Sequence, residues 1–226
     1  VIDCLRLTEE LQHPATRLNT LWYVAWVYYQ RRDRAAMRAS LTELLELASN
    51  HEFSTMTGAA KFLLSIDACL EEKELVDLLA RFESTWESSN WHRVFCLCVL
   101  AEACIEAGHA KYGLAVLASI SSEDRNAIYA PEIYRLEGEL RLRISPPDMG
   151  LIEHCFRSAL VLARQRKERS LELRAAMSLA RLWRDQGKRV DARGLLRPVY
   201  EWFTEGLDLR ELKDARALLD DFEQST

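Results

Sequence analysis

Residues 170–183 read SLELRAAMSLARLW, and this stretch decides the fold. Its small and apolar residues recur at intervals of three and four, which is the spacing of one face of an α-helix. Gly187 then marks a turn, and a second run with the same spacing follows it. The residues that carry the two runs are Ala176, Leu179, Ala180 and Trp183, then Ala192, Leu196 and Val199. The pattern predicts two antiparallel helices that pack closely at Ala180.

Four further segments carry the same pattern less regularly. Their small positions are Ala25, Ser65, Ala101 and Gly138, so that the five small positions follow one another after 40, 36, 37 and 42 residues. A two-helix unit of this length resembles the tetratricopeptide repeat (TPR), whose ideal period is about 34 residues. The second segment, around Ser65, matches least well, because Glu71-Glu72-Lys73 stands where a glycine turn is usual.

Composition agrees with a helical array. The 226 residues include only eight glycines and five prolines, which leaves little room for hairpins. We therefore predict an all-α fold, a right-handed α-solenoid of about five degenerate TPR-like helix pairs in a single domain, 1–226. The predicted repeats are 1–50, 51–90, 91–128, 129–167 and 168–206. Residues 207–226 are predicted to form a terminal capping helix.

The start of that capping helix has its own signals. Gly206 is expected to close the preceding helix in a left-handed conformation. Asp208 is then expected to be the N-cap of the last helix, with Glu211 completing a capping box. An apolar stripe over residues 212–222 predicts the buried face of this helix.

Several stretches in the second half resemble one known family. They are EIYRLEGEL at 132–140, CFRSAL at 155–160, the stretch 170–183, YEWFTEG at 200–206 and LKDARALL at 212–219. Together they are similar to the C-terminal TPR region of bacterial STAND-type signalling ATPases, which often carry a class III adenylate/guanylate cyclase or winged-helix domain. The resemblance implies that this chain is a piece of a longer cytoplasmic protein. It transfers no catalytic residue, since the chain has no Gly-rich phosphate loop ending in Lys-Ser/Thr.

The residues that could carry chemistry favour a non-catalytic chain without metal or cofactor. A metal site could be formed by His92, Cys96, Cys98 and Cys104. However, Cys96 and Cys98 point about 200° apart on a helix. Structural zinc needs four converging ligands, so core cysteines are favoured here. All six cysteines are expected to be buried free thiols. No serine or cysteine stands in a glycine-flanked nucleophile turn.

The TPR resemblance also implies where a partner would bind. The first helices of successive repeats line the concave surface in that family, and a peptide lies along it. Carried onto this sequence, the groove residues are Trp22, Trp26, Tyr29, Phe62, Phe95, Glu102, Glu132, Arg135, Glu139, Arg174, Arg181 and Arg184. Such a groove is aromatic at one end and basic at the other, which suits a peptide with apolar anchors and an acidic tail. The alternative, left open, is that the aromatic residues belong to the core.

Charge is unevenly distributed along the chain. Residues 157–200 hold twelve basic and four acidic residues, whereas residues 43–87 hold three basic and ten acidic ones.

We expect a protein–protein interaction or regulatory module whose partner is a protein, a peptide or another domain of the parent chain. An oligomerisation scaffold with oppositely charged ends is the alternative, and an enzyme with a novel site is a third hypothesis. Nucleic acid is disfavoured because no DNA- or RNA-binding motif accompanies the basic residues, and no apolar run is long enough for a membrane span.

Overall fold

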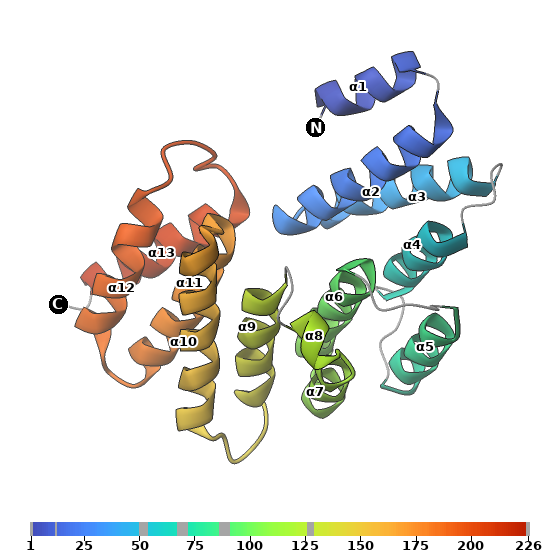
Figure 1. The fold of residues 1–226 in the computed structure, drawn as a ribbon. Helices are drawn as coiled ribbons and strands as arrows, with labels where there is room; N and C mark the ends of the chain where they lie inside the picture. Colours follow the sequence, from blue (N-terminus) through green and yellow to red (C-terminus); the bar gives the residue numbers. More distant parts are fainter. Residues whose placement is uncertain are drawn as a thin grey trace. The chain divides into compact units, whose positions relative to one another are not determined.

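The described part of the chain is helical throughout. The computed structural model describes residues 2–11, 13–49, 54–66, 72–85, 91–125 and 129–224, which form α-helices and connections without a β-strand (Figure 1). The all-α prediction is therefore confirmed. Glu71, and Cys69 among the six cysteines, lie outside the described residues. The chain divides into two compact units, residues 1–96 and 97–226, and each is described by itself.

The first unit contains α1 (Ile2–Leu11), α2 (Pro14–Gln30), α3 (Arg34–Ser49), α4 (Ser54–Ile66), α5 (Glu72–Thr85) and the beginning of α6 (Trp91–Ala107). Helix α2 begins with Pro14 directly after His13, whose ring nitrogen accepts a hydrogen bond from the Thr16 amide at 3.3 Å. Asp33 caps α3 in the same way, accepting from the Ala36 amide at 3.0 Å. The short connection at residues 31–33 makes α2 and α3 pack along their length.

The core of the first unit is aromatic where α2 meets α6. The ring centroid of Trp22 lies 5.1 Å from that of His92 and 5.8 Å from that of Phe95. Tyr29 meets Phe95 edge to face at 5.2 Å. Ala25, the predicted small position, is buried on the same helix. Edge-to-face ring pairs contribute more stabilising energy than their buried area alone would give. They therefore fix α2 against the first turns of α6.

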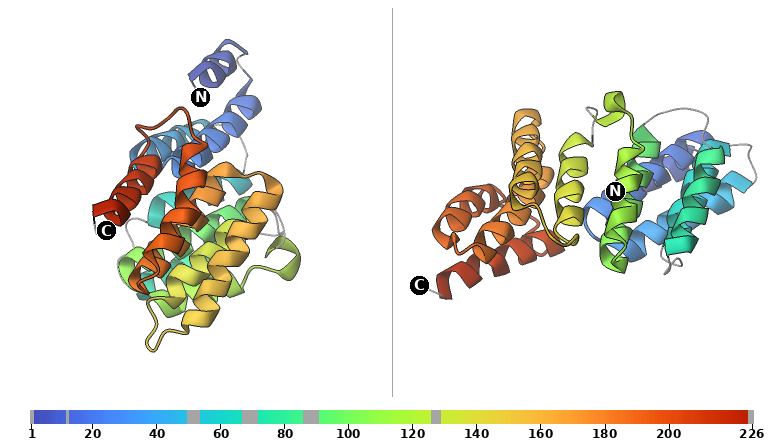
Figure 2. Two further views of the ribbon diagram at one scale, coloured as in Figure 1. Left: turned by 90° about the vertical axis from the view of Figure 1, so that its left-hand side faces the viewer. Right: turned by 90° about the horizontal axis from the view of Figure 1, so that it is seen from below.

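The second unit contains the rest of α6, α7 (Ala110–Ala118), α8 (Ser122–Arg125), α9 (Ala130–Arg141), α10 (Met149–Arg166), α11 (Arg169–Asp185), α12 (Arg189–Glu201) and α13 (Arg210–Gln224). Helices α9, α10 and α11 pack side by side, and α13 packs against α11 and α12 (Figure 2). One apolar core runs through α10 to α13 and includes Phe156, Leu196 and Phe222. The apolar stripe predicted over 212–222 is buried in this core, as expected.

Two glycines end helices where the sequence predicted turns. Gly108 follows α6 with a φ of +81°, and Gly187 follows α11 with a φ of +80°. This left-handed conformation suits glycine because it has no Cβ to clash with the backbone. The amide of Lys188 then donates back to the Trp183 carbonyl at 2.8 Å, which satisfies a carbonyl at the end of α11.

Gly138, the small position of the fourth predicted repeat, allows α9 and α10 to approach closely. A Cβ at this position would lie 2.5 Å from Cε1 of Phe156, whose ring is fully buried. Any side chain here would therefore have to displace an aromatic ring that has no free space around it. The requirement for a small residue, inferred from the repeat pattern, has its physical cause in this contact.

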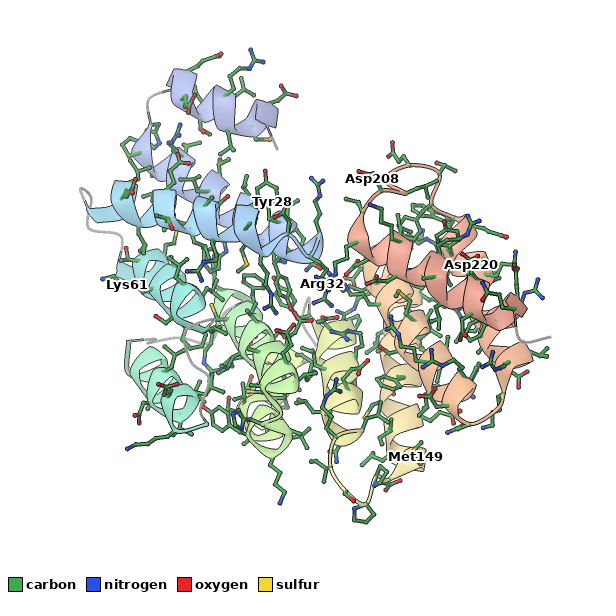
Figure 3. All side chains as sticks on the ribbon, turned by 180° about the vertical axis from the view of Figure 1, so that it is seen from behind. Tyr28, Arg32, Lys61, Met149, Asp208 and Asp220 are labelled. Carbon is green, nitrogen blue, oxygen red and sulfur yellow. The ribbon has the colours of Figure 1, made fainter. Side chains whose placement is uncertain are left out.

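The start of the last helix differs from the prediction. Helix α12 ends at Glu201 and α13 begins at Arg210, so Gly206, with its left-handed φ of +68°, lies within the connection. Asp208 also lies on this connection rather than at the helix start (Figure 3). The capping-box interpretation is wrong, because the Glu211 carboxylate pairs with Arg174 of α11 instead.

A matched pair of glycine substitutions tests the α9–α10 contact. Gly138→Ala is expected to lower the free energy of unfolding by about 1–3 kcal/mol, because the added methyl group overpacks the site against Phe156. Gly194→Ala in α12, where no atom lies within 4 Å of the added Cβ, is expected to raise it by about 0.5–1 kcal/mol. Urea denaturation of both variants measures this, and a stabilising Gly138→Ala would contradict the close approach.

Candidate functional site

The candidate site begins with three charged residues on one face of α9. Glu132, Arg135 and Glu139 are three and four residues apart, so their side chains lie along the same side of the helix. The Arg135 guanidinium donates to both Glu132 oxygens, from Nε at 2.9 Å and from Nη2 at 2.7 Å. This two-point geometry is the strongest form of an arginine–carboxylate pair. The two side chains are only 8% and 2% exposed.

Helices α11, α13 and α6 extend this pairing beyond α9. Arg174 lies 3.3 Å from the Oε1 atom of Glu132 and donates from Nε to Glu211 of α13 at 2.5 Å. Ser178, one turn further along α11, donates its hydroxyl proton to Oε1 of Glu139 at 2.7 Å. Glu102 of α6 adds a carboxylate 3.8 Å from Arg135. We call these residues the charged network: Glu102, Glu132, Arg135, Glu139, Arg174, Ser178 and Glu211.

Arg135 keeps its charge although it is buried. Burial alone would lower the pKa of Arg135, but the carboxylates of Glu132, Glu102 and Glu139 outweigh this effect and raise the pKa well above its ordinary value. Arg135 is therefore a permanent cation inside the fold. Because a buried charge without a partner is costly, each member of the network depends on the others.

Exposure rises along the face of α11 that carries the network. The side chain of Arg174 is 3% exposed and Ser178 is buried, whereas Arg181 is partly buried and Arg184 is 33% exposed. Arg184 pairs with Asp185 at 2.9 Å and with Asp221 at 3.7 Å. This face of α11 thus becomes accessible to solvent beyond the network, toward the end of the helix.

Arg181 differs from the other arginines of this face. It makes no hydrogen bond or ion pair with any residue in the part of the chain that the structure describes. Burial lowers its pKa, while Glu139 and Asp214 attract its charge over a longer range and Arg135 and Arg184 repel it. Its guanidinium therefore stands at the edge of the network with its donors unmatched.

The aromatic end of the predicted groove lies elsewhere. Four of its five aromatic residues are buried in the first unit, and Trp26 is partly buried. The buried residues are Trp22, Tyr29, Phe62 and Phe95. As placed here they belong to the core, the alternative that the sequence left open. The physical reason is that the first turns of α6 pack over α2 and cover the rings of Trp22 and Tyr29.

The charged end of the predicted groove is brought together. Glu102, Arg135, Glu139 and Arg174 meet in the network, and Arg181 and Arg184 continue the same face of α11. The TPR resemblance predicts that these residues lie together on one exposed surface. Glu102, Arg135 and Arg174 are buried instead, because they pair with one another and with Glu132.

Two members of the network were missed at the sequence level. Ser178 stands four residues after Arg174 and three before Arg181, and this helical spacing is a signal that places it on their face. Glu211 was assigned to a capping box, so its pairing with Arg174 was overlooked. Its partner is 37 residues away in sequence, and no local pattern connects the two.

The described cysteines and acidic residues form no metal centre. Within the described ranges, no group of three or more His, Cys, Asp or Glu side chains is placed to hold a metal ion. Cys96, Cys98, Cys104 and Cys155 are buried free thiols, and burial raises the pKa of Cys96 well above its usual value. Cys4 is exposed, which contradicts the expectation that all the cysteines are buried.

A second concave surface lies on α10, α11 and α12. This pocket has a volume of about 700 Å³ and is lined by Glu153, Arg157, Trp183, Lys188, Val190, Asp191, Gly194 and Leu195. The Arg157 guanidinium stacks over the Trp183 ring at 5.0 Å and also pairs with Glu153 at 2.8 Å. Val190 at its margin is largely exposed. None of the predicted groove residues lines this pocket.

Comparisons with known proteins add no assignment. No protein-family model, no curated protein and no solved structure matches the chain. Among the described helices, none combines the length and the apolar character that crossing a membrane requires.

Removal of the shared carboxylate tests the network. Glu132→Gln is expected to lower the free energy of unfolding by about 3–5 kcal/mol, because Arg135 and Arg174 both lose a buried counter-charge that they share. Glu153→Gln is the matched control, since its partner Arg157 is 56% exposed, and we expect it to cost less than about 1 kcal/mol. Urea denaturation compares the two, and equal effects would show that the network contributes no more than a surface pair.

Proposed function

We propose that this chain is a TPR-like interaction module that binds a segment of a partner protein and catalyses no reaction itself. The observation that carries the proposal is the convergence of Glu102, Arg135 and Arg174 into one network. These residues come from α6, α9 and α11, the first helices of three successive predicted repeats. The TPR resemblance independently predicts that these three residues line one binding surface.

The arrangement of the helices agrees with the finer fold proposal. Each of the pairs α2/α3, α9/α10 and α11/α12 consists of two helices that pack on each other across a short connection. Helix α13 follows the last pair and covers its apolar face, as a capping helix does. We extend this to a right-handed α-solenoid of about five degenerate TPR-like pairs.

The family resemblance supplies a context for such a module. In STAND-type signalling ATPases, the region that 132–140 and 170–183 resemble lies C-terminal to the catalytic domains. A module there would bind a partner or hold the catalytic domains of its parent in an inactive state. The parent would then be an adenylate cyclase-like protein or a transcriptional regulator, located in the cytoplasm.

The partner is expected to present acidic groups. With four of the five aromatic residues in the core, the solvent-facing end of α11, which carries Arg181 and Arg184, is the charged part of the predicted groove that a partner could reach. Both are cations on one face of the helix. An acidic segment of a protein is complementary to this surface.

Selection of peptides tests the proposed function. A displayed library of random peptides, about 12 residues long, is expected to yield sequences rich in Asp and Glu when selected on the full chain. Synthetic versions should bind Arg184→Glu at least about tenfold more weakly, since a like charge then replaces an attractive one. Val190→Glu, at the second concave surface, is the control and should leave binding unchanged. Failure to enrich any peptide, or equal loss with both variants, would refute the proposal.

The alternative function is an end-to-end scaffold, and sedimentation separates it from the peptide-binding module. Assembly through oppositely charged segments would give oligomers at about 20 mM salt that dissociate at about 0.5 M, since exposed charges are screened by salt. A peptide-binding module is expected to sediment as a monomer at both concentrations. Salt-sensitive oligomers would favour the scaffold.

A further inference from the structure

The pocket on α10, α11 and α12 contains a glycine that no contact in the described part of the chain requires. Gly194 lies inside α12, and a Cβ at this position would have no atom within 4 Å. At Gly113 and Gly138, by contrast, the missing side chain lets Leu140 and Phe156 approach. Gly194 also lacks the left-handed φ that favours glycine at helix ends. Because glycine destabilises a helix interior relative to alanine, what this position gains is an open pocket wall.

Apolar side chains surround this open position. Val190, one helical turn before Gly194, is 85% exposed at the margin of the pocket. Leu195 and Trp183 pack against the core and also line the pocket, so each is only partly buried. An apolar side chain that enters this hollow is therefore removed from water on several sides, which is the main source of binding energy at such a site.

The aromatic wall of the pocket is held in place by an ion pair. The Arg157 guanidinium stacks over the Trp183 ring at 5.0 Å. Glu153, one turn earlier on α10, accepts hydrogen bonds from Arg157 Nε at 2.9 Å and from Nη2 at 2.8 Å. A wall that is already fixed loses little freedom when a ligand packs against it.

The charges that line the pocket balance, so the pocket attracts neither an acidic nor a basic segment as a whole. They are Glu153, Arg157, Lys188 and Asp191. The first two pair with each other. Lys188 and Asp191 are exposed and lie three residues apart at the start of α12. A complementary partner therefore carries an acid and a base on opposite sides of its apolar anchor.

The charged residues next to the pocket are engaged elsewhere. Arg189 and Arg193 bond to residues of α13, at 3.2 Å and 3.3 Å. Arg184 pairs with Asp185 at the end of α11. None of these four residues lines the pocket, so the four lining charges decide what it accepts.

The α12 wall favours a helical partner over an extended one. Its lining residues recur after three and four positions, which is the spacing of a helix surface. The ridges of a second helix fit the grooves of such a surface, and the missing side chain at Gly194 lets the two helices approach closely. An extended peptide relies on backbone hydrogen bonds, whereas the backbone groups inside α12 are already bonded within the helix.

We propose that this pocket is a second docking site, which binds an amphipathic helix of a partner protein. One large apolar side chain of that helix lies over Gly194 and packs against Trp183 and Val190. An acidic residue one turn to one side of this anchor faces Lys188, and a basic residue one turn to the other side faces Asp191. The site uses none of the residues of the α11 surface proposed for acidic segments, and the inference does not rest on that surface.

Selection of helical peptides on the full chain tests this proposal. The library is an alanine-based helix of about 18 residues, in which the central residue and the residues one turn before and after it are randomised. We expect the selected peptides to carry a large apolar residue at the centre, with one acid and one base beside it. A synthetic version should shift the indole N–H resonance of Trp183 in the ¹⁵N-labelled chain and leave that of Trp202, outside the pocket, unmoved.

A substitution that fills the pocket supplies the sharpest variant. Gly194→Leu is expected to melt at or above the temperature of the unmodified chain, because no atom lies within 4 Å of the added Cβ. It should bind the selected peptide at least about tenfold more weakly. Gln165→Leu adds the same side chain at an exposed position of α10 outside the pocket. This matched control should change the affinity less than about twofold.

Two further variants test the apolar margin and the flanking charges. Val190→Glu should weaken binding of the helical peptide at least about fivefold, while Arg184→Glu should leave it unchanged. Lys188→Glu combined with Asp191→Lys should weaken it about two- to fivefold and should prefer a peptide whose acid and base are exchanged.

The outcomes separate this inference from the proposed function. Selected peptides without an apolar centre, an unmoved Trp183 resonance, or equal affinities of Gly194→Leu and Gln165→Leu would overturn the inference. Self-association of the unmodified chain that Gly194→Leu abolishes would also overturn it, since the occupant would then be a second copy. If acidic peptides bind and no helical peptide does, the inference fails while the proposed function stands. If only helical peptides bind, the inference stands and the acidic-segment surface fails.

Discussion

The structure of the second unit depends on one shared carboxylate. Glu132 receives two hydrogen bonds from Arg135 on its own helix and also lies 3.3 Å from Arg174 on α11. Arg174 in turn reaches Glu211 on α13. These ion pairs hold α9, α11 and α13 in register, because moving one helix would leave a buried charge without its partner. Burial of ion pairs adds little net stability, but it penalises every arrangement in which a partner is missing.

This constraint complements the apolar packing on the other side of the same helices. The contact of Gly138 with Phe156 sets how closely α9 approaches α10, and it tolerates no larger side chain. The charged network sets how α9 is aligned with α11, because hydrogen bonds depend on direction as well as distance. Apolar burial therefore supplies most of the cohesion, while the network selects one alignment among those that would bury similar area.

Local spacing predicted much of this unit, and long-range contacts account for the failures. The helical period and the turns at Gly108 and Gly187 follow from neighbouring residues, and so does the common face of Arg174 and Arg181. Whether that face is exposed depends on carboxylates from other helices. Glu211 illustrates the limit, because the capping-box pattern was present but a distant arginine competed for its carboxylate. For the aromatic residues of α2 the sequence left groove and core open, and only the contact of Trp22 with Phe95 of α6 indicates the core.

A rigid network behind a partly exposed arginine has a consequence for recognition. Ser178 precedes Arg181 by less than one turn, and its hydrogen bond to Glu139 fixes that part of α11 against α9. The backbone of Arg181 is therefore held in place by the fold itself, so that in the proposed complex only its side chain would lose freedom on binding. Preorganisation of this kind lowers the entropic cost of association. If the proposed partner binds here, its specificity would depend on a few fixed donors, because a hydrogen-bond donor that is buried without an acceptor is costly.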